Sequence, residues 1–330
     1  MNRRKIRFDD HPELPFEEWE TKPVPKRPSA GVYDKVKIET PRTASSPEKR
    51  DNRLFYISLA SGSSGNCSYI GTSKGGVLID AGIKPDQIEE ALAANGLDLR
   101  MVRGILLTHD HGDHTKYVYP ILRNNRNMSL FCTNRVRDGL LKRHNVSKRI
   151  NEYHVPVFKE IPFKVGELEI TAFEVSHDGV DNVGFSIEFD ERRFVIATDM
   201  GMVTPRARHY ISQANYLVFE SNYDSAMLTM GRYPEYLKAR IRSSIGHMDN
   251  AATASFLREI YTRELKYIFL CHLSRDNNTP AKAVTATRDA LEGAGLKVGR
   301  AEETLSDKAA DVQLMALPRF EATRLFVFRP

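Results

Sequence analysis

The chain has 330 residues, enough for one large domain or two ordinary ones and for a sizeable hydrophobic core. Its formal net charge of +5 is compatible with a polyanionic partner but is too small to establish one. No run of about eighteen apolar residues is present, which excludes a helical membrane span. The basic residues 1–5 are not followed by an apolar stretch, so we expect no secretory signal.

Residues 1–52 differ in composition from the rest, because they hold seven of the sixteen prolines, mixed charge and little apolar periodicity. We expect a disordered proline-rich extension here, followed by a single folded domain over residues 53–330. The only tryptophan, Trp19, lies in the extension. It suggests a short docking motif for a protein partner, with a plain tail as the alternative.

From Arg53 onward, short apolar runs are separated by glycine turns, and they predict strands and helices in alternation. We expect strands over 54–59, 67–71, 77–79, 104–108, 130–132, 169–175, 183–189, 193–197, 216–219 and 266–271. We expect helices over 85–95, 117–126, 134–144, 205–212, 234–242, 250–264 and 280–292. The mixture is typical of an α/β protein whose sheets are covered by helices.

The three cysteines, Cys67, Cys132 and Cys271, do not have the spacing of a disulfide framework or of a thiolate zinc site. Each lies in an apolar run, which predicts buried packing. Free thiols fit a reducing compartment, so we expect a cytoplasmic protein.

The strand over 104–108 leads directly into three imidazoles and two carboxylates within residues 108–114. Imidazole and carboxylate are the usual ligands of zinc, manganese and iron. In an extended chain His109 and His111 project to the same side. Gly112 permits a sharp turn, which would direct Asp113 and His114 to a second point nearby. The spacing therefore suggests two adjacent metal ions.

His109, His111, Asp113 and His114 match the His-x-His-x-Asp-His signature, and in this the chain resembles the metallo-β-lactamase fold. The resemblance implies a four-layer αβ/βα sandwich with the metals in the cleft where two sheets meet. Three more residues at predicted strand ends match the order of the family's later motifs: His177, Asp199 and His272.

The resemblance implies a complete set of ligands for two divalent ions, zinc or manganese. One metal would be held by His109, His111 and His177, the other by Asp113, His114 and His272, with Asp199 as the bridge. A metal-activated hydroxide would then attack a phosphodiester. We assign catalytic roles to Asp113 and His247; the resemblance implies that His247 acts as a general acid, and the alternative is a packing or capping histidine.

A more specific resemblance extends over residues 54–300. The segments 58–67, 78–82, 220–224, 231–234, 246–250 and 272–278 resemble the YycJ/WalJ exonuclease group. That resemblance implies a DNA exonuclease that acts from 5′ ends and is linked to repair. The extension over residues 1–52 is not part of the group's usual pattern, which leaves room for the protein partner.

Substrate contacts are expected from Ser63, Ser64, Asn66, Asn222 and Arg275. Residues 61–66 are small and polar, so their backbone amides could approach a phosphate, although an ordinary tight turn has the same composition. Two basic runs could follow a nucleic-acid backbone or form solvated helix faces. They are Arg123, Arg126, Arg135, Arg137, Lys142, Arg143, Lys148 and Arg149, and then Lys238, Arg240 and Arg242.

Three alternatives to a DNA exonuclease remain at this stage. Two are enzymes of the same fold: a hydrolase of small cyclic phosphodiesters and a ribonuclease, since fold alone does not name a substrate. The third is a non-catalytic adaptor that binds nucleic acid or protein and docks through its tail. No ligand is missing from the set, which disfavours the adaptor.

Overall fold

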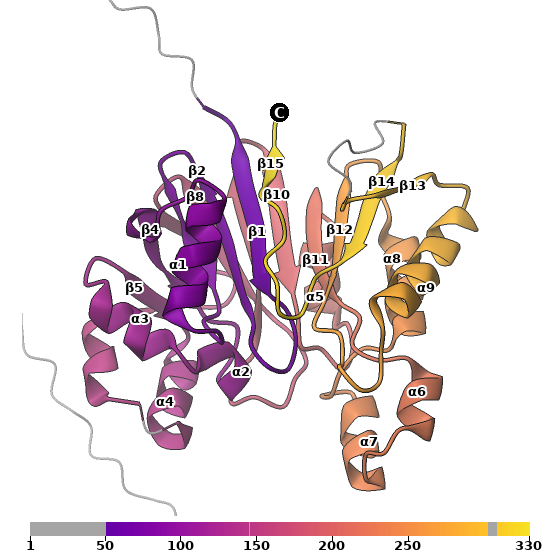
Figure 1. Cartoon of the computed structure of the whole chain (residues 1–330), viewed down its shortest axis with the longest axis horizontal. Helices are drawn as coiled ribbons and strands as arrows, with labels where there is room; N and C mark the ends of the chain where they lie inside the picture. The colour runs from indigo at the N-terminus through magenta and orange to yellow at the C-terminus, as the bar shows by residue number, and fades with distance from the viewer. Residues whose placement is uncertain (1–50, 145, 303–308) are drawn as a thin grey trace, which may run out of the picture. The chain divides into compact units, whose positions relative to one another are not determined.

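The computed structural model describes residues 51–144, 146–302 and 309–330. The extension predicted over residues 1–52, with Trp19, lies outside these ranges apart from Asp51 and Asn52. The predictions for that extension are therefore not tested. The rest of the chain folds around two sheets that stand face to face, with helices on their outer sides (Figure 1).

The first sheet, sheet A, has seven strands in the spatial order β15-β1-β2-β3-β4-β5-β6. In chain order they are β1 (Leu54–Ala60), β2 (Cys67–Thr72), β3 (Gly75–Ile79), β4 (Val102–Leu106), β5 (Ser129–Cys132), β6 (His154–Pro156) and β15 (Phe326–Phe328). β3, β4, β5 and β6 run parallel to one another, whereas β1 pairs antiparallel with β2 and β15.

The second sheet, sheet B, has eight strands in the order β13-β14-β12-β11-β10-β9-β8-β7. They are β7 (Phe163–Val165), β8 (Leu168–Glu174), β9 (Val183–Phe189), β10 (Arg192–Ala197), β11 (Tyr216–Glu220), β12 (Tyr267–Cys271), β13 (Val298–Arg300) and β14 (Val312–Ala316). The central strands β10, β11 and β12 are parallel. Their carboxyl ends therefore lie at one edge of the sheet, where ligands commonly bind in α/β proteins.

Helices cover the outer face of each sheet and complete four layers. The helices are α1 (Pro85–Ala94), α2 (Gly112–Thr115), α3 (Val118–Asn124), α4 (Asn134–Arg143), α5 (Pro205–Ile211), α6 (Ser225–Met230), α7 (Glu235–Arg242), α8 (Asn250–Ile260) and α9 (Pro280–Glu292), with 3-10 turns at Leu99–Met101 and Lys148–Glu152. Buried residues of α1, α3 and α4 share a core with sheet A, and those of α5, α8 and α9 share one with sheet B. The predicted αβ/βα sandwich is confirmed.

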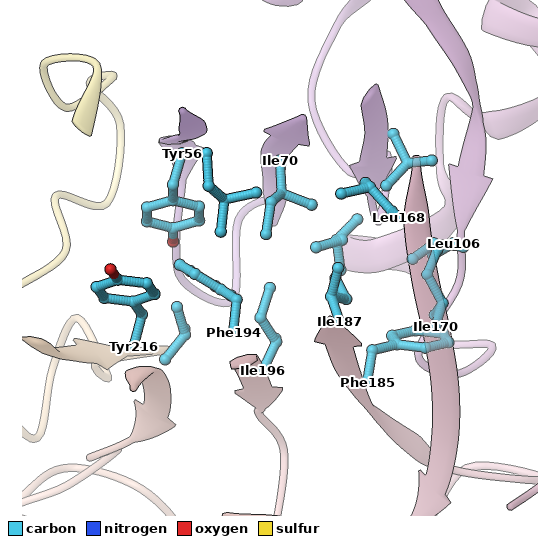
Figure 2. Close-up of a cluster of buried hydrophobic side chains, with 14 of the residues drawn as sticks. Tyr56, Ile70, Leu106, Leu168, Ile170, Phe185, Ile187, Phe194, Ile196 and Tyr216 are labelled. Carbon is cyan, nitrogen blue, oxygen red and sulfur yellow. The ribbon is translucent and has the colours of Figure 1, made fainter. Parts of the chain in front are cut away.

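The sequence of β1 shows how one strand serves two layers. All seven of its residues are buried, and successive side chains point to opposite faces. Leu54 and Tyr56 belong to the core between the sheets, while Ile57 and Leu59 belong to the core under the helices. Figure 2 shows the inter-sheet core, in which side chains of the two sheets point toward one another.

Truncation of Phe194 is expected to destabilise the fold more than any surface change. Its ring is fully buried between the sheets, 4.6 Å from the ring of Tyr56. Phe194→Ala should lower the free energy of unfolding by about 3–5 kcal/mol through lost burial and a residual cavity. Urea denaturation measures this, with Phe158→Ala as the control, because Phe158 is 56% exposed. Equal losses in both variants would contradict the assignment of the core.

Most predicted elements are confirmed to within one or two residues, and the differences have local causes. The helix expected over 250–264 ends at Ile260, because Tyr261 is extended and residues 262–265 form a turn into β12. β6, β7, β13 and β15 have three residues each and were not predicted, since each is short and includes an exposed residue, so none forms a continuous apolar run. β14 was also missed, as were α2 and α6.

The cysteines lie as predicted: Cys67, Cys132 and Cys271 are all buried and free. Burial raises the pKa of the Cys132 thiol to about 12, so this thiol is inert. Among the described helices, none combines the length and the apolar character needed to cross a bilayer.

Candidate metal centre

The structure brings all seven predicted ligands together at the edge where the two sheets meet. Sheet A supplies residues from the segment after β4, namely His109, His111, Asp113 and His114. Sheet B supplies residues that follow β8, β10 and β12, namely His177, Asp199 and His272. Gly112 does not make the isolated turn that the sequence suggested. It begins α2, whose first turn carries Asp113 and His114.

Three residues at this edge adopt the left-handed backbone conformation that side chains usually avoid. They are Asp80 with φ 60°, Asp199 with φ 54° and His272 with φ 53°, each directly or nearly directly after a strand. Aspartate and histidine tolerate this region better than most residues, and such outliers persist where the surrounding structure fixes them. The chain therefore turns sharply at each strand end and directs these side chains to a common point.

The candidate ligands form two triads. His109, His111 and His177 make the first triad, and Asp113, His114 and His272 make the second. Within each triad, the ligating atoms lie within 4.8 Å of one another. Asp199 lies between the triads, and it forms a group of the same closeness with His109 and His114. This division is the one the sequence suggested; that these side chains hold metals stays a proposal.

A hydrogen bond from Nδ1 to a neighbour orients three of the candidate histidine rings. The Nδ1–H of His109 donates to the Thr108 hydroxyl (2.9 Å), and that of His114 donates to Asp80 (2.7 Å). The Nδ1–H of His177 donates to the Gly246 carbonyl (3.0 Å). The Nε2 of His109 has no partner among the described residues, whereas His114 Nε2 lies 2.9 Å from the Asn66 amide and His177 Nε2 lies 3.3 Å from His111 Nδ1. Hydrogen bonds of the Nδ1 kind set the tautomer of metal-binding histidines.

His109 provides a test of whether these residues fit a metal. Its Nε2 is buried and has no hydrogen-bond partner in the part of the chain that the structure describes. Such an atom is costly to bury unless something binds it. Burial, reinforced by the charge of His114, lowers the pKa of His109 well below its usual value, which keeps the ring neutral as a metal ligand must be. The donor set of imidazoles and carboxylates fits zinc or manganese.

Charge balance in the second triad leads to the same conclusion. Burial would lower the pKa of His272, but Asp199, Asp113 and Glu220 raise it to about 10. Burial would likewise raise the pKa of Asp199, but the charges of His272 and His114 hold it well below its usual value. Protons on the histidines thus balance the negative charge of the buried carboxylates. Metal cations bound at the same place could supply that positive charge in place of the protons.

Glu220, the last residue of β11, is a functional candidate that the sequence analysis did not single out. Its side chain is fully buried, and its Oε1 accepts from His247 Nδ1 (2.7 Å) and lies 3.3 Å from His272 Nδ1. Its Oε2 accepts from the backbone N–H of Met200 (2.7 Å). Burial lowers the pKa of His247, but the Glu220 charge outweighs this and raises it. The sequence signal that could have identified Glu220 is a carboxylate at the end of an apolar strand.

Two further carboxylates were also missed, and both lie against candidate ligands. Asp80 is buried and accepts from the backbone N–H of Thr108 (3.0 Å) as well as from His114. Asp178 has its Oδ1 3.3 Å from His111 Nε2, while its Oδ2 accepts from Arg240 (2.6 Å). The motif 78–82 contained Asp80, but its role required the fold.

The predicted substrate residues separate into buried and exposed ones. The Asn66 amide lies 2.9 Å from His114 Nε2 and donates to Asp113 (3.2 Å), and the Asn222 amide donates to the His272 carbonyl (2.7 Å). These two residues therefore support the ligands; a contact with substrate stays a prediction. Ser63, Ser64 and Arg275 are exposed at the rim and are free to meet a substrate.

The basic runs are less available than the sequence suggested. Lys238 is buried, donates to the Thr229 carbonyl and pairs with Glu235, so it ties α6 to α7 and does not follow a nucleic-acid backbone. Arg137, Arg143 and Arg149 pair with acidic neighbours. The other members of the first run are exposed: Arg123, Arg126, Arg135, Lys142 and Lys148.

Metal binding is expected to stabilise the protein against heat. A ligand that binds only the folded state at about 100 times its Kd adds about 2.7 kcal/mol, or about 5 °C in Tm for a domain of this size. Zinc or manganese should therefore raise Tm of the EDTA-treated protein, and calorimetry measures the shift. Asp199→Asn should lose most of the shift, whereas an unchanged shift in that variant would place the metals elsewhere.

Comparisons with known proteins agree with this geometry. A model of the β-lactamase superfamily domain matches residues 76–269. The exodeoxyribonuclease YycJ of Bacillus anthracis is 34% identical over 256 residues, which cover 76% of this chain and 94% of YycJ. The exodeoxyribonuclease WalJ of Streptococcus pneumoniae is 33% identical, over 74% of this chain and 90% of WalJ.

A solved structure supports the fold independently of close sequence similarity. The metallo-β-lactamase fold protein YhfI of Bacillus subtilis aligns with a TM-score of 0.58 at 12% identity, over 84% of this chain and 100% of YhfI. The family model, the two relatives and the convergence of histidines and carboxylates at the sheet edge all agree. The chain belongs to the YycJ/WalJ group of the β-lactamase superfamily and is a metal-dependent hydrolase.

Proposed function

We propose that the protein is a dinuclear metal-dependent phosphodiesterase that degrades DNA from 5′ ends. The observation that carries the proposal is the pair of triads with Asp199 between them. Two adjacent divalent ions suit phosphodiester hydrolysis, because such a pair can stabilise both the attacking and the leaving oxygen. The names of the relatives, both exodeoxyribonucleases, support DNA as the substrate.

The first triad would hold one ion and the second triad the other, with Asp199 touching both. Zinc and manganese both fit this donor set. When bound, the metals supply a nucleophile at neutral pH and neutralise charge that develops on the phosphate. The 22% exposure of the Asp113 side chain gives it access to both a metal and the substrate, which supports its catalytic assignment.

We propose that His247 protonates the leaving oxygen. Glu220 accepts from its Nδ1, which leaves Nε2 as the nitrogen that can present a proton, and the side chain is 18% exposed. Its ring centroid lies 5.3 Å from that of His272 and 5.1 Å from that of His177, so it borders both triads. This position supports a general acid more than a packing or capping role.

Cleavage of defined DNA tests the proposal. The purified full chain is incubated with manganese or zinc and with duplexes labelled at either the 5′ or the 3′ end. Stepwise loss of nucleotides from 5′ ends that EDTA abolishes is the expected result. RNA and small cyclic phosphodiesters are tested in parallel, and a preference for either would replace the DNA assignment. Unchanged cellular function in Asp199→Asn would support the adaptor instead.

We also propose that the enzyme acts in DNA repair in the cytoplasm. The group resemblance supports the first point, and three free buried thiols support a reducing compartment. Loss of the gene should raise mutation frequency, and the wild-type chain, but not Asp199→Asn, should restore it. A protein partner for residues 1–52 stays a prediction.

A further inference from the structure

A groove of about 540 Å³ lies beside the metal centre and is not used by the mechanism above. Its walls come from the end of β1, the loop over residues 61–66, the start of α1, the residues after α2 and the segment that joins β14 to β15. In Figure 1 that last segment runs beside β1, and the backbone N–H of Thr323 donates to the Ser58 carbonyl (2.8 Å). The segment is thus fixed to sheet A.

The groove and the metal centre share a wall. Gly65 and Gly82 line the groove, and the backbone N–H of Gly82 donates to the Asn66 carbonyl (2.9 Å). A Cβ on Gly82 would lie 1.7 Å from the carbonyl oxygen of Asp113, so the backbones approach as closely as only glycine permits. The groove therefore lies directly against the backbone that carries the candidate ligand Asp113.

Positive charge predominates in the groove. Lys84, Lys116 and Arg319 line it, against the single carboxylate of Glu90. Within the ranges that the structure describes, neither lysine forms an ion pair. Arg319 donates from Nη2 to the Leu273 carbonyl (2.7 Å), while its Nε is buried without a described hydrogen-bond partner. Burial and the nearby charge of Arg275 lower the pKa of Arg319, and an anion would relieve that repulsion.

An exposed aromatic ring lies in the same place. Phe320 lines the groove and is 63% exposed, and the Arg319 guanidinium lies 5.8 Å from its ring. A phenylalanine beside cationic side chains is the arrangement that binds single-stranded nucleic acids, since an unpaired base stacks on the ring while phosphates meet the charges. In a duplex the bases stack on one another, so none of their faces is open to stack on the Phe320 ring.

We propose that this groove binds unpaired nucleotides adjoining the scissile phosphate, with a base stacked on Phe320 and phosphates against Lys84, Lys116 and Arg319. The inference rests on the proposed function. It adds that the DNA must be single-stranded next to the phosphate that is cleaved. Two other occupants would explain the groove less completely. A free inorganic anion would contact the cationic side chains but not the Phe320 ring, and a protein segment would bring neither a base to stack on that ring nor a phosphate for the cations.

Fluorescence provides a direct test in the full chain. Phe320→Trp in a Trp19→Phe background leaves one indole, placed in the groove. In EDTA, so that no strand is cut, a thymidine oligonucleotide should quench its emission by stacking. An abasic oligonucleotide of equal length should bind more weakly and not quench it. Equal quenching by both strands, or none by either, would overturn the stacking.

Variants of the natural groove provide a second test. Phe320→Ala should weaken binding of the oligonucleotide about tenfold. Phe158→Ala, which removes an exposed phenylalanine that does not line the groove, should leave binding unchanged. Lys84→Gln combined with Lys116→Gln should reduce the slope of log affinity against log salt by about 1.4. No change in affinity or slope would overturn the groove as the binding site.

The kinetic test separates this inference from the proposed function. Phe320→Ala should raise KM about tenfold for single-stranded DNA with metal present, but it should leave hydrolysis of bis(p-nitrophenyl) phosphate unchanged. If Phe320→Ala cleaves single-stranded DNA as well as the wild-type protein does, the groove is overturned as a binding site while the proposed function stands. Wild-type protein without metal-dependent cleavage would overturn the proposed function itself.

Discussion

Asp199→Asn is expected to abolish metal-dependent hydrolysis, lowering kcat by about 1,000-fold or more. The Asp199 carboxylate lies between the two triads, 3.9 Å from His177 Nε2 in the first and 3.2 Å from His114 Nε2 in the second. Removing its charge weakens both proposed metal sites at once, and several kcal/mol of transition-state stabilisation depend on them. Cleavage of end-labelled DNA and metal content per chain are the two measurements.

The choice of asparagine keeps this test specific. Asp199 has φ 54°, a conformation that asparagine tolerates and that alanine would adopt only with strain. Loss of activity in Asp199→Asn therefore reports the charge and not a disturbed backbone. Asp289→Asn serves as the control, because Asp289 is an exposed carboxylate on α9. Full metal content and activity in Asp199→Asn would contradict the proposed centre.

His247→Ala is expected to slow DNA cleavage by about 100- to 10,000-fold, the usual range for loss of a general acid. The effect should depend on the leaving group. DNA expels a basic alkoxide that needs a proton, whereas bis(p-nitrophenyl) phosphate expels a phenolate that does not. Hydrolysis of the second substrate should therefore change little. The ratio of the two rates, wild type against variant, is the measurement.

Glu220→Gln provides the companion variant for His247. It keeps the shape of the side chain but removes the buried charge that raises the pKa of His247 and holds its Nδ1–H. DNA cleavage should fall more than cleavage of the activated diester, although less steeply than in His247→Ala. A uniform loss on both substrates in His247→Ala would assign the ring to structure and not to proton transfer.

The convergence of the seven candidate ligands could be predicted from the sequence because its signal is local. His109, His111, Asp113 and His114 lie in one short segment, and His177, Asp199 and His272 each follow an apolar run. Strands with strong apolar character and helices that begin with proline were found for the same reason, since their signals lie within a few residues. The fold class then followed from the resemblance.

What escaped prediction depends on contacts between distant segments. Glu220 gains its role only when β11 lies beside β12, and Asp80 only when β3 lies beside β4. Lys238 looked like a surface cation in sequence, yet its stem is buried and its ammonium caps a carbonyl of a neighbouring helix. β15 has three residues and is defined by its pairing with β1. No local pattern encodes such partners.

The division of ligands between the sheets has a consequence for how the protein opens. Each triad takes two residues from the sheet A side and one from the sheet B side, so neither half holds a complete site. Bound metals would therefore connect the sheet A half to the sheet B half where the two sheets meet. Amide hydrogen exchange should therefore slow in both sheets together when metal binds. A chain whose two halves are not correctly packed against each other would bind no metal and have no activity. Occupancy of the centre would then report correct assembly before any DNA is cut.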